Sequence, residues 1–208
     1  MTDNNVLLAF FTTSVILALS PGPDNLFVMA QSAQKGRMAG LFVTLGLATG
    51  LIGHTFAVAF GLAAIIRASM FAFTTLKFLG AAYLLYLAWH AFRAGVATAN
   101  KEEVQVFSRG NLSQRVIIMI LTNPKVSLFF LAFLPQFADP RRGSMMLQFF
   151  QLGAIFIMAT IFVFGLISFV AGGVGEKFSN SPLAQKIVNR TASAVFIGLA
   201  LKLALSER

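Results

Sequence analysis

Two ionisable residues, Asp24 and Lys125, follow prolines that interrupt apolar segments. Asp24 lies in the stretch SPGPDN (20–25), and Lys125 ends the stretch TNPK (122–125). The neighbouring candidate site residues are Pro21, Gly22, Pro23, Asn25, Asn123 and Pro124. A carboxylate can bind a cation or carry a proton, and a helix that restarts after a proline presents free backbone N–H groups to an anion. The pattern therefore predicts a binding site for charged groups at two helix breaks.

The segments around these breaks are apolar enough to span a membrane. Of the 208 residues, 57% are hydrophobic and only 11% are charged. A spanning helix needs about 20 mostly apolar residues. The charge-poor runs of about this length are 6–33, 38–66, 71–92, 116–137, 145–174 and 187–205. We therefore expect an all-α, polytopic membrane protein with six transmembrane helices in a lipid bilayer.

The basic residues indicate a topology rather than a nucleic-acid partner. The formal net charge is +9, but the Lys and Arg residues are scattered through short connections and form no basic face. The connections 34–37, 93–115 and 175–190 hold most of them. The positive-inside rule then predicts that both termini lie outside the cytoplasm.

The most polar connection, residues 94–112, divides the chain into halves of about 1–93 and 113–208. Each half has three predicted spans, so related halves would be inserted in opposite orientations. Residues 19–27 and 121–129 align as a leucine, a hydroxyl, a proline-bearing break and a Leu-Phe pair. We expect one domain over 1–208, built as two inverted three-helix repeats with broken first and fourth helices. Paired breaks of this kind are typical of the binding sites of secondary transporters.

Less specific interpretations of the breaks stay open. A proline kink is common in membrane helices and need not mark a site. Asp24 and Lys125 would each cost about 2.5–3.5 kcal/mol at the bilayer centre, which a plain kink does not explain. Asp24 avoids that cost if its break lies near the interface, and Lys125 avoids it if its side chain extends to the interface.

The second apolar run, 38–66, has a face of small residues, because Gly46, Gly50, Gly53 and Gly61 recur at helical spacing. Such a face lets another helix approach closely. His54 lies among these glycines and is either a proton relay or a hydrogen-bonded structural residue.

Several kinds of chemistry find no support in the sequence. The chain has no cysteine, so it has no disulfide and no thiolate metal site. Neither a GxSxG nor an HExxH motif is present, and the remaining carboxylates of the middle and end of the chain fall in connections. We therefore expect no enzymatic activity, no metal and no cofactor.

Four stretches together resemble the LysE/RhtB family of bacterial amino-acid exporters. They are SPGPDN at 20–25, the glycines at 36, 40, 46 and 50, KFLGAAYLLYL at 77–87, and TNPK at 122–125. The likeness covers essentially the whole chain. It implies a multi-pass protein of the bacterial inner membrane that exports amino acids or close derivatives in exchange for protons, as an antiporter.

The resemblance leaves several properties open. Members of the family move basic amino acids, homoserine and its lactone, threonine, leucine or cysteine-related compounds, and the sequence does not select among them. It also leaves open the coupling stoichiometry and whether the protein forms a homo-oligomer. The alternatives of another class are a channel, which can also contain broken helices, and a membrane subunit with no transport role.

Overall fold

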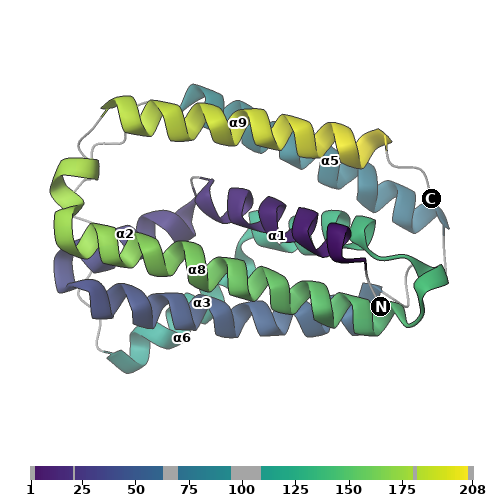
Figure 1. Ribbon diagram of the computed structural model, residues 1–208, viewed down its shortest axis with the longest axis horizontal. Coiled ribbons are helices and arrows are strands. Elements are labelled where there is room, and N and C mark those ends of the chain that lie inside the picture. The colour runs from purple at the N-terminus through teal and green to yellow at the C-terminus, as the bar shows by residue number, and fades with distance from the viewer. Residues whose placement is uncertain (1–2, 21, 63–69, 95–108, 180–181, 206–208) are drawn as a thin grey trace.

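The computed structural model describes residues 3–20, 22–62, 70–94, 109–179 and 182–205, and every regular element in these ranges is a helix (Figure 1). The elements are α1 (Asn4–Leu19), α2 (Pro23–Lys35), α3 (Arg37–Ala57), η1 (Val58–Leu62), α5 (Met70–Arg93), α6 (Arg109–Thr122), α7 (Pro124–Leu128), η2 (Phe129–Phe133), η3 (Leu134–Phe137), η4 (Pro140–Arg142), α8 (Met145–Ser179) and α9 (Pro182–Leu205).

The described residues contain between two and four candidate membrane spans. Arg37–Gly61 and Met145–Ala171 are long and apolar enough to cross a bilayer as single helices. Two bent pairs qualify if each counts as one span: α1 with α2, bent by 64°, and the pair Arg115–Thr122 and Pro124–Phe137, bent by 49°. The other two expected spans correspond to α5 and α9, which carry basic residues such as Lys77 and Arg190 and are not among the candidates. The fold is thus helical and suited to a membrane, while the arrangement of six spans stays a prediction.

The helix ends follow from local sequence. Asp3 caps α1, because its Oδ1 accepts a hydrogen bond from the backbone N–H of Asn5 at 3.0 Å. Gly36 separates α2 from α3 with a φ of 82°, a value that favours glycine. Asn123 separates α6 from α7, and its Oδ1 accepts from the backbone N–H of Lys125 at 3.0 Å.

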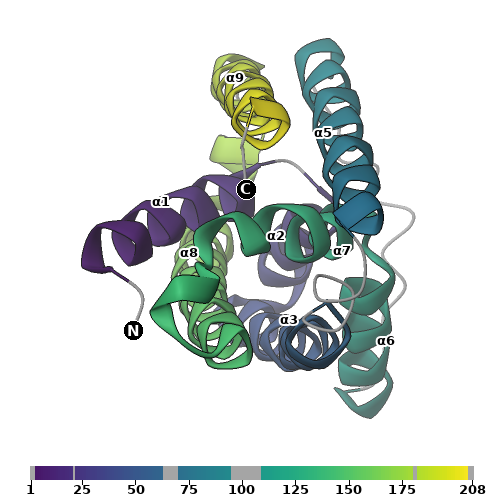
Figure 2. The same cartoon turned by 90° about the vertical axis from the view of Figure 1, so that its right-hand side faces the viewer.

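The helices pack in pairs that relate the two halves of the chain. The most extensive packing joins α5 to α9, and the next joins α3 to α8. The broken segments lie across these pairs, since α1 and α2 pack on α8 while α6 packs on α3. In Figure 2, α5 and α9 lie to one side of the other helices. The most extensive contacts therefore join a helix of the first half to a helix of the second.

A core of aromatic side chains holds the second broken segment in place. Phe129, Phe130 and Phe133 of η2 are buried. Phe129 contacts Phe133, Phe10 of α1 and Phe156 of α8, and Phe130 also contacts Phe156. The outward faces of the helices are apolar as well, with exposed side chains that include Phe42, Leu45, Ile52, Phe56, Phe162 and Phe169. Apolar surface on this scale indicates contact with lipid.

Candidate functional site

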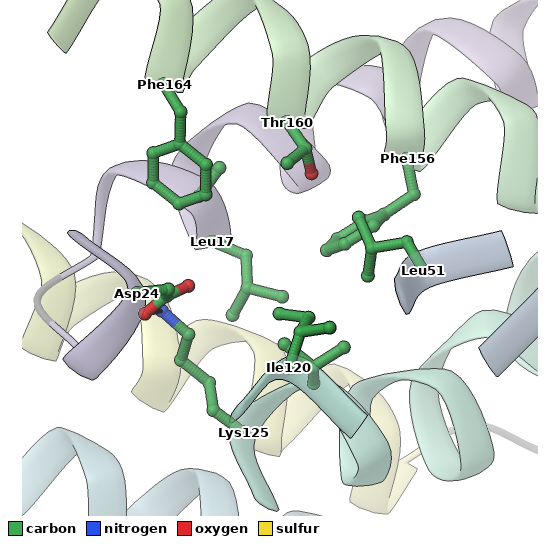
Figure 3. A pocket seen from close by; sticks show the side chains of 10 residues that line it. Leu17, Asp24, Leu51, Ile120, Lys125, Phe156, Thr160 and Phe164 are labelled. Atoms are coloured by element: carbon green, nitrogen blue, oxygen red, sulfur yellow. Dashed lines mark hydrogen bonds and ion pairs between the residues drawn. The ribbon is translucent and has the colours of Figure 1, made fainter. Parts of the chain in front are cut away.

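The two charged residues predicted at the helix breaks form a buried ion pair. Lys125 Nζ lies 3.1 Å from Asp24 Oδ1, and the side chains are 5% and 4% exposed. The two residues are 101 positions apart in the chain. Lys125 Nζ also donates to the backbone carbonyl oxygen of Ser20 at 3.2 Å, so it spans the first break. The side chain of Lys125 therefore points inward and does not extend to the surface (Figure 3).

Side chains replace the backbone hydrogen bonds that the first break removes. The carbonyl oxygen of Leu17 would pair with the N–H of residue 21 in a continuous helix, but that residue is a proline. Instead it accepts from the Ser20 hydroxyl at 2.6 Å. The carbonyl oxygen of Ala18 accepts from Nδ2 of Asn25 at 2.7 Å. Ser20 and Asn25 therefore stabilise the break itself, as a segment without access to water requires.

His54 has the same role at the second break. The carbonyl oxygen of Ile120 would pair with the N–H of residue 124, which is again a proline. His54 Nε2 lies 3.0 Å from this oxygen, and the backbone N–H of Asn123 lies 3.2 Å from it. Because a carbonyl oxygen only accepts, Nε2 must carry the hydrogen. The geometry accounts for His54 as a structural donor, and a relay role stays a prediction.

A small cavity adjoins the ion pair. Its volume is about 10 Å³, roughly the space of a single water molecule. Figure 3 shows Asp24 and Lys125 across from Phe156, Thr160 and Phe164 of α8. Apart from the ion pair, the side chains that line it in the described part of the chain are uncharged, and most are apolar. In this conformation the cavity is too small for an amino acid.

The remaining predicted site residues surround the pair or support the backbone beside it. A Cβ on Gly22 would lie 2.5 Å from Asp24 Oδ1 and 2.8 Å from Lys125 Nζ, so the ion pair needs glycine there. Pro23 and Pro124 occupy the first turns of α2 and α7, where a missing N–H costs nothing. Pro21 lies outside the described residues.

Two amides at the breaks retain unused hydrogen-bonding capacity. Asn25 Oδ1 and Asn123 Nδ2 are buried, and neither atom has a partner among the described residues. One is an acceptor next to Asp24 in the sequence, and the other is a donor two positions before Lys125. Buried polar atoms without partners are rare enough to call for an explanation.

Two further buried polar residues, Gln31 and Thr160, were not predicted from the sequence. Gln31 is fully buried, and neither atom of its amide has a partner in the described part of the chain. It lies about two turns from Asp24 on the buried face of α2. Thr160 lines the cavity from α8. Both were visible in the sequence as polar residues inside the apolar runs 6–33 and 145–174.

The ionisable groups do not gather into a metal site. Among the described residues there is no group of three or more His, Asp or Glu side chains placed to hold a metal ion. The site therefore consists of two opposite charges, unpaired amides and an apolar wall, which suits ligand binding.

Comparison with known proteins identifies the family of the chain. The sequence model described as LysE type translocator matches residues 15–207. The chain belongs to the LysE translocator family. The family is one of transporters, so membership places the chain among membrane translocators rather than enzymes.

Curated relatives match along most of their own length. The chain is 33% identical over 189 residues to a protein of Salmonella typhimurium named homoserine/homoserine lactone efflux protein, covering 91% of each chain. It is 31% identical over 209 residues to an uncharacterized membrane protein of Vibrio cholerae, covering 99% of each. It is also 32% identical over 198 residues to an uncharacterized membrane protein of Pseudomonas aeruginosa. No solved structure matches.

Proposed function

We propose that this protein exports amino acids or close derivatives from the cytoplasm across the bacterial inner membrane in exchange for protons. The observation that carries the proposal is the buried ion pair between Asp24 and Lys125, at the point where two broken helices meet. The efflux relative of Salmonella typhimurium supports the substrate class.

The pair matches the two charges of an amino acid. The ammonium group binds Asp24, and the carboxylate binds Lys125 together with the free backbone N–H groups at the start of α2. Asn25 Oδ1 and Asn123 Nδ2 then supply one further acceptor and one further donor. These atoms gain partners on substrate binding, which accounts for their lack of partners here.

Protons couple to substrate through competition at one carboxylate. A proton that neutralises Asp24 removes the charge that holds the substrate ammonium group. Proton binding and substrate binding therefore exclude each other at this residue. If each can leave the site on either side of the membrane, the proton gradient drives the amino acid outward.

Movement of the two halves opens the site. The cavity of about 10 Å³ must widen before an amino acid fits. In our proposal the domain over 1–208 consists of two inverted three-helix repeats, supported by the packing of α3 on α8 and of α5 on α9. Rocking of such repeats about a central site gives alternating access. Gln31, between the site and the end of α2, offers unpaired polar atoms along the cytoplasmic route.

Efflux from proteoliposomes tests this function. Labelled amino acids are loaded, a proton gradient is imposed, and wild type is compared with Asp24→Asn. We expect saturable, gradient-driven efflux in wild type and a loss of at least tenfold in the variant, because the amide cannot exchange a proton or balance an ammonium ion. Asp139→Asn makes the same chemical change at a carboxylate remote from the cavity and is expected to transport normally.

The alternatives give different results in the same assay. Flux that does not saturate would favour a channel, and absence of flux for every amino acid would favour a subunit with no transport role. Proton-coupled efflux that persists in Asp24→Asn would remove this residue from the mechanism.

A further inference from the structure

We infer that Lys125 is a charge filter that restricts transport to amino acids with uncharged side chains. The inference rests on the proposed function, since it concerns the same site, but it names the substrate class that the family leaves open. Its basis is the charge balance of the cavity.

The cavity is electrically neutral as it stands. Asp24 and Lys125 carry its only two ionisable side chains among the described lining residues, and they compensate each other. Two ammonium groups of neighbouring helices, on Lys77 and Lys202, have contacts elsewhere. Lys77 Nζ donates to the carbonyl oxygen of Ala204 at 3.4 Å, and Lys202 Nζ lies 4.4 Å from the centroid of the Phe137 ring. No second carboxylate of the described chain faces the site.

A neutral amino acid preserves this balance. Its ammonium group takes the place of Lys125 Nζ at Asp24 Oδ1, and its carboxylate pairs with the released Nζ. Each buried charge then keeps an opposite partner, which a low-dielectric site demands. The exchange leaves the total charge of the cavity at zero.

A charged side chain breaks the balance. Lysine or arginine would bring a second cation into a cavity whose single carboxylate is already paired, and glutamate would bring a second anion. Beyond the pair, the wall offers apolar groups such as Leu51 and Phe156, and the Thr160 hydroxyl. It therefore suits aliphatic or hydroxylated side chains and gives a charged group no partner.

Counterflow with a panel of labelled amino acids tests the filter in the full-length protein. Wild type is expected to prefer threonine, homoserine or leucine over lysine, arginine and glutamate by at least tenfold. Lys125→Met leaves Asp24 alone, so the ratio of lysine to threonine flux should rise at least tenfold as the substrate supplies the missing cation. Lys202→Met removes an ammonium group outside the cavity and should leave the ratio unchanged. Because each ratio comes from one sample, loss of folded protein does not alter it.

A second variant gives the cavity the same net charge as Lys125→Met while it keeps Lys125. Thr160→Asp adds a carboxylate to the opposite wall and should also raise the lysine to threonine ratio. Transport of lysine or arginine by wild type as fast as threonine would overturn the filter and leave the exporter intact. An unchanged ratio in every folded variant would overturn it as well. Absence of transport for every amino acid would instead overturn the proposed function.

Discussion

The carbonyl oxygens freed at the helix breaks determine what the polar side chains near the site do. Four of these oxygens have a side-chain partner in the described residues, and each partner is a different residue. The partners are Ser20, Asn25 and Lys125 at the first break, and His54 at the second. Polar side chains in these segments therefore complete the hydrogen bonding of the backbone. Lys125 does so at the first break, and in our proposal it also binds the substrate.

The hydrogen bond of His54 can be tested apart from transport. His54→Leu removes the donor and leaves the carbonyl oxygen of Ile120 with a weaker partner, so the free energy of unfolding in detergent should fall by about 1–3 kcal/mol. His54→Gln keeps an N–H donor near the same position, so its free energy of unfolding should fall less. Denaturant titrations of the two variants measure the difference. Equal losses would mean that the imidazole contributes by packing, for example against Phe130, and not by donation.

The carboxylate of Asp139 should titrate at unusually low pH. Hydrogen bonds from Arg141 hold its pKa below the ordinary value of 3.8. A lowered pKa in the folded state means that the contact stabilises the loop above about pH 4 and is lost only as the pH falls through the lowered value. Carboxyl NMR shifts should give a midpoint under 3.8, and Arg141→Ala should raise it. A midpoint at or above 3.8 in the wild type would contradict this contact.

The sequence could predict Asp24 and Lys125 as individual site residues because each interrupts an apolar run next to a proline. It could not predict their contact, since they are 101 positions apart in the chain and lie on helices whose packing the sequence does not show. Gln31 and Thr160 were missed for a different reason. A single polar residue in a membrane helix usually bonds within its own helix, and only the three-dimensional structure shows which ones do not.

At the scale of elements, the breaks themselves were predictable and the helix contacts were not. The prolines determine where α1 and α6 end. The small-residue face of α3 predicted close approach of another helix, but not that the partner would be the end of α6. Which helix packs on this face depends on how α6 and α8 divide the surface of α3 between them.

Gly50 should be the glycine at which this approach is most sensitive. A Cβ there would overlap Cγ2 of Ile120, on the residue whose carbonyl oxygen binds His54. Gly50→Ala should therefore destabilise the protein by about 1–3 kcal/mol and impair transport. Gly198→Ala is the matched control, because a Cβ at that helical position has nothing within 4 Å. It should be neutral or stabilising by up to about 1 kcal/mol through helix propensity. Similar thermal stabilities for the two variants would argue against tight packing of α3 on α6.

At the scale of the whole molecule, the helices alternate in direction between two ends. Figure 1 places the start of α1 and the end of α9 at one end, with the end of α2, the start of α3, the end of α8 and the start of α9 at the other. The second end is the one that carries the basic connections at 34–37 and 175–190. The basic connections at 34–37 and 175–190 therefore lie at the same end of the helices, and in our proposal this end faces the cytoplasm, as the positive-inside rule predicts.

Single cysteines at exposed positions test this assignment. The natural chain has none, so each variant carries one label site without background. Asn4→Cys is at the start of α1 and Ser144→Cys directly precedes α8, whereas Gln34→Cys is in the last turn of α2. Figure 1 shows the starts of α1 and α8 at one end of the helices and the end of α2 at the other. In intact cells, a membrane-impermeant maleimide should label the first two, and it should label Gln34→Cys only after the membrane is opened. The reverse pattern would overturn the predicted orientation of the protein, although the direction of export would not change, because the proton gradient sets the direction of an exchanger. Labelling of all three from outside would contradict the membrane topology, because these ends would then share one side.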